Sequence, residues 1–291
     1  MRIHTAASRY VRQLRADGRS PHTIAQVSRH VGLLARWLAA HRLPTDVRRV
    51  THEHIARFLV SRDATCRPDG ETKKATATNA LRSSLRTFFT YVHAAGYAPR
   101  NAAALVRRAK CATPPPRALP EGDCRRLLAT LAASDDEHAA RDHLLFRLLV
   151  ETGLRIGSAL ALEVRDVDLA ASELTLRRMK GDRPDRVAVP KGLRGQLRAY
   201  LRGRDEGALF LGRDGRPMTA RHARRRLAVW LRRAGVERHA SPHALRHSFA
   251  AAAYRRTRDI VAVQRLLRHR AAVSTMVYAR SAATADSHGL R

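Results

Sequence analysis

Three consecutive prolines, Pro114 to Pro116, divide this 291-residue chain into two parts. Proline lacks a backbone N–H donor and favours extended conformations, so no helix continues through this stretch. Basic residues flank the prolines on both sides. We therefore predict a basic, semi-rigid linker over residues 107–119, between a first domain over residues 1–106 and a larger domain over residues 120–291.

The first part shows only helical patterns. Ser20 followed by Pro21 is typical of a helix start, and apolar residues then recur at steps of three and four. A second strong helix is predicted over residues 75–93, and shorter ones over residues 8–15 and 53–61. Because no alternating strand pattern appears before the prolines, we predict an all-α domain of about four helices.

The second part mixes helices with one hairpin. An apolar run over residues 144–150 predicts a helix that stops at Gly153. Residues 173–177 and 186–189 alternate like strands around a turn-rich segment, and they predict an antiparallel hairpin. Further helices are predicted over residues 221–234, 242–255 and 260–267. The predicted fold class is mainly α with one small antiparallel sheet.

The charge of the chain points to a polyanionic partner. Lys and Arg number 56 against 25 Asp and Glu, which gives a net charge of +31. A positive potential of this size attracts nucleic acid. A codon bias would explain the preference for arginine over lysine, but it would not explain the shortage of acidic residues. A membrane-surface role is disfavoured because the charge is spread along the chain rather than held in one amphipathic helix.

Two further features bear on the compartment. No run approaches the roughly 20 apolar residues that span a bilayer, and the first residues lack the apolar core of a secretory signal. The three cysteines, at positions 66, 111 and 124, cannot all pair with one another and have no ligand-like spacing. We therefore expect a cytoplasmic protein without a membrane partner.

Six polar residues in the second part carry the chemical signal. The first follows the end of a predicted helix, and the second lies at the tip of the predicted hairpin. The third and fourth share a helix face because they are three residues apart, and the fifth and sixth are nine residues apart. In chain order they are Arg155, Lys180, His243, Arg246, His269 and Tyr278.

These six residues, in this order and behind a helical domain, resemble the tyrosine recombinase (phage integrase) family, most closely its compact Xer-type members. The helix start over residues 20–23 extends the resemblance to nearly the whole chain. The resemblance implies an N-terminal SAM-like four-helix domain that clamps DNA and a mostly helical catalytic domain. It also implies site-specific DNA recombination through a 3′-phosphotyrosyl intermediate, with no ATP, metal or other cofactor.

The residue types suit this chemistry. Arg155 and Arg246 are expected to hold the two non-bridging phosphate oxygens and to stabilise the charge of the five-coordinate transition state. Alone, Arg155 would more often be a helix-capping cation. Because both are expected together and in order, we predict that both arginines are catalytic.

Tyr278 is the expected nucleophile, although a lone tyrosine is more often a packing residue. Its ordinary pKa near 10 leaves it protonated at neutral pH, so it needs a nearby base. His243 is expected to accept that proton and Lys180 to protonate the departing 5′-oxygen. His269 is expected to hydrogen-bond the phosphate. A solvated hairpin lysine is the alternative for Lys180.

The sequence departs from the family pattern at two positions. Ser158 stands where an acidic residue usually supports the first arginine, and Arg268 replaces the usual glycine before His269. Neither change removes a reacting group, but both bear on catalytic efficiency, and the Arg268 guanidinium is able to add a phosphate contact. His243 and His247 are spaced like a metal pair, but no third ligand supports such a site, and we expect none.

The polar face of the helix over residues 75–93 is predicted to enter a DNA groove, unless it is simply solvated, through Asn79, Arg82, Ser83 and Arg86. A second contact is predicted in the later domain, through Arg221, Arg224 and Arg225. The resemblance implies a tetramer that joins two double-stranded DNA segments and binds inverted half-sites. An accessory protein or partner recombinase is possible.

Two rival functions stay open at this point. The same chemistry would serve a type IB topoisomerase-like enzyme that nicks and closes DNA as a monomer. A catalytically weak DNA-binding protein would result if Ser158 or Arg268 had compromised the site.

Overall fold

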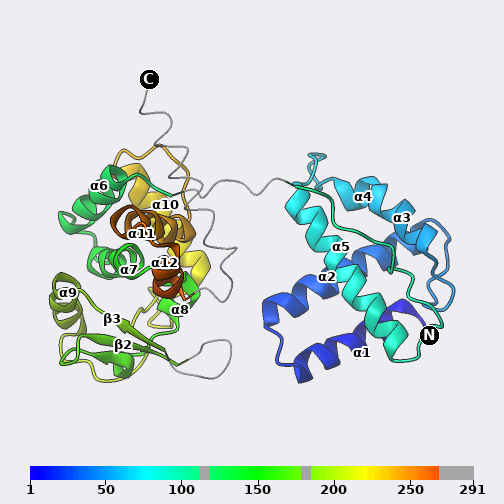
Figure 1. Ribbon diagram of the computed structural model, residues 1–291, viewed down its shortest axis with the longest axis horizontal. Helices are drawn as coiled ribbons and strands as arrows, with labels where there is room; N and C mark the ends of the chain where they lie inside the picture. Colours follow the sequence, from blue (N-terminus) through cyan, green and yellow to red (C-terminus); the bar gives the residue numbers. More distant parts are fainter. Residues whose placement is uncertain (112–117, 178–184, 269–291) are drawn as a thin grey trace. The chain divides into compact units, whose positions relative to one another are not determined.

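A computed structural model of the chain describes residues 1–111, 118–177 and 185–268. The chain forms two compact units, Met1–Thr113 and Pro114–Arg291 (Figure 1). Our finer assignment of a domain, a linker and a second domain stays a prediction.

The N-terminal unit is a helical bundle around one apolar core. The longest helices, α2 and α5, pack against each other and bury Leu34 and Phe88 completely. Ser20 caps α2, because its hydroxyl accepts a hydrogen bond of 3.3 Å from the Thr23 N–H. The one-turn helix α4 was not predicted, since four residues are too few to show a helical period. The described helices are α1 (Ile3–Ala16), α2 (Pro21–Ala40), α3 (His52–Val60), α4 (Arg62–Thr65) and α5 (Ala75–Ala94).

The C-terminal unit combines helices with a three-stranded antiparallel sheet in the order β1–β2–β3. Leu174 of β2 faces Val187 of β3, and both side chains enter the core beside Phe146 and Trp230. The strands are β1 (Val167–Asp168), β2 (Glu173–Leu176) and β3 (Asp185–Ala188). The described helices are α6 (Glu121–Ala132), α7 (Ala139–Thr152), α8 (Ile156–Leu160), the 3₁₀ turn η1 (Val164–Asp166), α9 (Lys191–Leu201), α10 (Ala220–Arg233), α11 (Pro242–Thr257) and α12 (Ile260–Leu267).

The predicted fold class is confirmed: both units are mainly helical, and the second carries a small antiparallel sheet. Strands β2 and β3 follow the predicted hairpin to within one residue at each end. Strand β1 was not predicted because two residues cannot show an alternating pattern. No helix in the described ranges is both long and apolar enough to cross a membrane.

A buried carboxylate fixes α10 against α7. Asp142 is completely buried and accepts hydrogen bonds from Arg141 (2.7 Å), Arg226 (2.5 Å) and the Trp230 indole (2.8 Å). Arg226 also bonds Asp136 at 2.8 Å. A buried charge is tolerated only when it is paired in this way, so the network holds α10 in one rotation about its axis.

Candidate active site and DNA-binding surface

Three of the six predicted catalytic residues lie in the described part of the chain, namely Arg155, His243 and Arg246. Lys180, His269 and Tyr278 lie outside the described residues. The site can therefore be built from its arginines and its first histidine.

Arg155 stands at a junction between two helices. Helix α7 ends at Thr152, Gly153 follows in the left-handed conformation (φ +64°), and α8 begins at Ile156. The Arg155 side chain is exposed, and no hydrogen bond or ion pair to its guanidinium is found within the described residues. The family's acidic residue is replaced by Ser158, and no carboxylate among the described residues forms an ion pair with Arg155 in its place. Among the described residues, none would have to be displaced for the Arg155 guanidinium to bind a ligand.

Arg246 is placed very differently, because its side chain is buried (3% exposed). Its guanidinium donates to the carbonyl oxygen of Gly153 and, at 2.6 Å, to that of Leu267. Gly153 lies two residues before Arg155, and Leu267 ends α12 two residues before His269. The buried Arg246 guanidinium on α11 thus bonds both the segment before Arg155 and the segment before His269.

His243 lies one turn before Arg246 on α11. Desolvation by the surrounding protein, followed by the positive charges of Arg246 and Arg155, lowers the pKa of His243 below its ordinary value. The influence of both arginines places all three groups in one region. The His243 ring makes an edge-on contact with His247, with ring centroids 4.7 Å apart. No set of three metal-ligating side chains is found in the described ranges.

Arg268 has a structural role that the sequence did not indicate. Its backbone is left-handed (φ +54°) at the end of α12, a conformation that favours glycine. Its guanidinium forms an ion pair with Asp185 and donates to the carbonyl oxygens of Arg186 (3.0 Å) and Leu266 (2.9 Å). The expected phosphate contact is therefore not supported. Instead, Arg268 ties the end of α12 to β3.

Gly153 supplies a test of this geometry. Because its φ is positive and an added Cβ would meet the ring of Phe249, Gly153→Ala is expected to lower the free energy of unfolding by about 2–4 kcal/mol. Gly157 in α8 is the control, since an added Cβ there meets nothing. Gly157→Ala should leave stability unchanged or raise it by up to about 1 kcal/mol. Urea denaturation of both variants measures the difference, and equal stabilities would contradict the assigned geometry.

The predicted DNA contact by Asn79 is wrong. Its side chain is only 1% exposed, its Nδ2 donates to the Ala109 carbonyl (2.9 Å), and its Oδ1 accepts from the Ala109 N–H (2.8 Å). Both ends of the amide are occupied by backbone, so no base edge can use them. Arg82 and Ser83 are half-buried, and Arg86 is exposed. Their contacts to DNA stay predictions.

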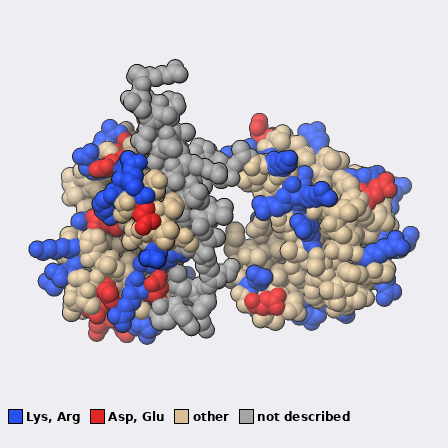
Figure 2. Space-filling view, in the orientation of Figure 1, with Lys and Arg blue, Asp and Glu red and all other residues tan. Residues whose placement is uncertain are grey.

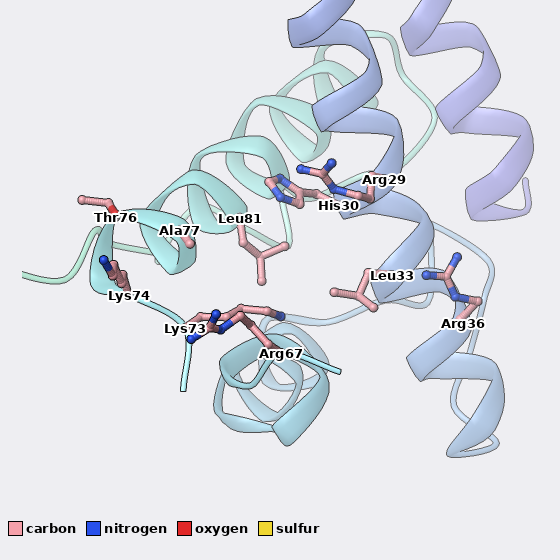
Figure 3. A pocket seen from close by; sticks show the side chains of 10 residues that line it. All are labelled: Arg29, His30, Leu33, Arg36, Arg67, Lys73, Lys74, Thr76, Ala77 and Leu81. Carbon is pink, nitrogen blue, oxygen red and sulfur yellow. The ribbon is translucent and has the colours of Figure 1, made fainter. Parts of the chain in front are cut away.

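A basic cavity in the N-terminal unit was missed by the sequence analysis. It measures about 540 Å³ and lies between α2, α5 and the segment before α5 (Figure 3). Leu33 and Leu81 line its apolar part, and no carboxylate lines it. Burial, then the charges of Arg29 and Lys73, lowers the pKa of His30 beside it to about 4. The cations that line the cavity are Arg29, Arg36, Arg67, Lys73 and Lys74.

Sequence reasoning missed these cations because they come from two separate segments, α2 and residues 67–74. Arginine is so frequent in this chain that no local cluster stood out, and only the fold brings the five together. The spacing of Arg29 and Arg36, two helical turns apart on α2, is the one signal that the sequence offered.

The three arginines of α10 that are predicted to contact DNA all lie on the surface of the C-terminal unit. Arg221, Arg224 and Arg225 are exposed, whereas Arg226 turns inward to Asp142 and Asp136. The buried network therefore sets the outward direction of the other three. Their contacts to DNA also stay predictions.

Comparison with known families covers both units. Residues 117–285 match the phage integrase family, and residues 7–96 match the N-terminal SAM-like domain of phage integrases. The chain is 33% identical over 277 residues to a tyrosine recombinase XerC of Chromobacterium violaceum, which covers 94% of this chain and 89% of that one. It is 30% identical over 278 residues to the tyrosine recombinase XerC of Neisseria meningitidis serogroup C (strain 053442), and the match covers 93% of this chain and 89% of that one.

Solved structures share the fold. A lambda integrase dimer bound to a COC′ core site matches with a TM-score of 0.69 and 19% identity, over 94% of this chain and 96% of that one. A lambda integrase tetramer bound to a Holliday junction matches with a TM-score of 0.70 and 18% identity, over 94% of this chain and 77% of that one.

Proposed function

This chain belongs to the phage integrase family of tyrosine recombinases, and from that premise we propose which residues carry its reaction and how it engages DNA. The protein is a site-specific DNA recombinase. The topoisomerase-like and weakly catalytic alternatives are not favoured, because the relatives that align over almost the whole chain are tyrosine recombinases.

One observation carries the assignment of the site: the buried Arg246 bonds the segment before Arg155 and the end of α12. We propose that the phosphate binds beside Arg246 and under the open fork of Arg155. Two planar guanidinium groups fit two non-bridging oxygens, and they stabilise the extra charge that develops in the five-coordinate transition state. Arg155 then reaches the phosphate from an exposed position, and Arg246 from a buried position fixed by two carbonyl oxygens.

The proposed reaction is a transesterification that needs no cofactor. The Tyr278 oxygen attacks the phosphorus while His243 takes the phenolic proton. The bond from phosphorus to the 5′-oxygen breaks, and Lys180 protonates that oxygen. His269 hydrogen-bonds the phosphate. The strand then remains joined to Tyr278 through its 3′-phosphate, and a 5′-hydroxyl from another strand reverses the steps to form the recombinant bond.

The lowered pKa of His243 predicts the pH profile. A base acts only when it is neutral, so a pKa below 6.5 keeps His243 active as the pH falls towards that value. We expect the acidic limb of kcat/KM to lie below pH 6.5, since this ratio reports the free enzyme. Single-turnover cleavage from pH 5 to 8 measures it. An acidic limb above pH 7, or one unchanged in His243→Gln, would contradict the role of His243.

We propose that both units contact DNA. In the N-terminal unit, the cavity with its five cations suits the DNA backbone, because phosphate contacts position a protein without reading sequence. In the C-terminal unit, the exposed arginines of α10 suit a second contact. The structures that share the fold include a dimer on a core site and a tetramer on a Holliday junction. By analogy we propose a tetramer on inverted half-sites that acts in the cytoplasm.

A two-site DNA assay tests the recombinase function. Two labelled duplexes that carry the recombination site are incubated with the protein, without metal or ATP. Four-way junctions and exchanged products are expected. Relaxation of supercoiled DNA without either product would instead favour nicking and closing.

A further inference from the structure

The last described residues of the N-terminal unit, 106–111, lie along α5 as an extended strap (Figure 1, the green trace beside α5). Its first residue, Val106, is buried in the core. Ala109 is held again by the side chain of Asn79. The strap therefore has two attachment points, three residues apart, and its intervening side chains project outward.

The Asn79 side chain binds the backbone of the strap at Ala109. Its amide donates to the carbonyl and accepts from the N–H of the same residue, Ala109, at 2.9 and 2.8 Å, as a neighbouring β-strand would. Its Nδ2 also contacts the Cys111 sulfur at 3.6 Å. A buried amide is stable only when its polar atoms are bonded, and here the strap supplies those bonds. Holding the strap thus accounts for a buried asparagine near the start of α5.

The strap carries cations without counter-ions. Arg107, Arg108 and Lys110 are exposed, and no ion pair to any of them is found within the described residues. The sequence contains no acidic residue between Glu71 and Glu121. Figure 2 shows Lys and Arg outnumbering Asp and Glu on the visible face of this unit. Cations crowded in this way repel one another, and a polyanion relieves that repulsion.

We propose that the strap binds DNA phosphates and that Asn79 is the residue that positions it. The inference rests on the proposed function in so far as the polyanion is recombination-site DNA. Asn79 orders the strap before DNA arrives, so the conformational entropy of these residues is not lost on binding. Asn79 thus contributes to DNA binding by positioning a segment that contacts the DNA phosphates, and not by contacting a base itself.

Four proteins test the proposal by their affinity for a duplex half-site between 50 and 200 mM salt. One is the wild type, one carries Arg107→Gln, Arg108→Gln and Lys110→Gln, one carries Asn79→Leu, and one combines all four changes. The control variant carries Arg15→Gln, Arg19→Gln and Arg48→Gln, which removes the same charge from exposed positions elsewhere in the unit.

Neutralising the strap is expected to weaken binding at least about tenfold and to make the log–log salt dependence shallower by about 0.9 for each phosphate that the strap no longer neutralises. Asn79→Leu is expected to weaken binding about three- to tenfold, but only when the strap is charged. The control should keep most of the affinity. Faster hydrogen exchange at the Ala109 amide, with an unchanged melting temperature, would show that Asn79→Leu frees the strap and leaves the fold intact.

Two results would overturn the proposal. The strap does not bind phosphates if its neutralisation weakens binding no more than the control does. Asn79 does not act through the strap if Asn79→Leu weakens binding equally with and without the strap charges. Either result leaves the proposed function standing as long as wild-type protein still cleaves DNA, and absence of wild-type cleavage would count against that function instead.

Discussion

Arg155→Lys is expected to slow DNA cleavage by about 10³–10⁵-fold while the protein still folds and binds DNA. Lysine keeps the positive charge but lacks the planar fork that holds two phosphate oxygens. Because the Arg155 side chain is exposed and has no partner among the described residues, the substitution removes no structural bond found there. Single-turnover cleavage of a nicked suicide substrate gives the rate, and a gel-shift titration gives the affinity.

Arg246→Lys is the matched comparison, because the same chemical change is made at a buried position. Cleavage should fall as far as in Arg155→Lys. In addition, the carbonyl oxygens of Gly153 and Leu267 lose their donors, so stability should fall by about 1–3 kcal/mol. DNA binding should be largely spared, so the variant separates the loss of cleavage from the loss of affinity. Cleavage within tenfold of wild type in either variant would contradict the arginine assignments.

Much of the fold could be predicted from local signals. The capped start at Ser20 and Pro21, the apolar stripe of α5 and the stop at Gly153 are each encoded within a few residues. Strand β1 and helix α4 were missed because they are too short to show a period. Their conformations depend on neighbours that are distant in the sequence.

The candidate site was predicted by the order of its residues, and only the described part can be compared. The sequence identified Arg155 and Arg246 alike, yet one is exposed and the other buried among backbone carbonyls. Such a difference depends on where α7 and α12 end relative to α11. No pattern within a single helix reveals it.

Asn79 and Arg268 show why polar residues are the hardest to interpret. Both had polar side chains suited to DNA, but Asn79 binds backbone at Ala109 and Arg268 binds β3. Helical spacing placed Asn79 on the polar face of α5, and the segment that Asn79 binds comes from 30 residues further along the chain. A single sequence cannot distinguish a polar face that meets DNA from one that meets another segment of the same chain.

Tyr278→Phe is expected to abolish covalent attachment to DNA completely, because phenylalanine has no oxygen to form the phosphotyrosyl bond. DNA affinity should stay within a few-fold of wild type, since the ring itself is kept. Tyr254 on α11 supplies the control, because Tyr254→Phe removes a hydroxyl from the same unit without touching the proposed reaction.

The most direct measurement is a denaturing gel of protein and nicked suicide substrates labelled in turn at each strand end. Wild type and Tyr254→Phe should both give a protein–DNA adduct joined to a 3′-phosphate, and peptide mapping should place the bond on Tyr278. Tyr278→Phe should give none. An adduct that persists in Tyr278→Phe, or one that forms at the 5′ end of the strand, would contradict cleavage by this tyrosine.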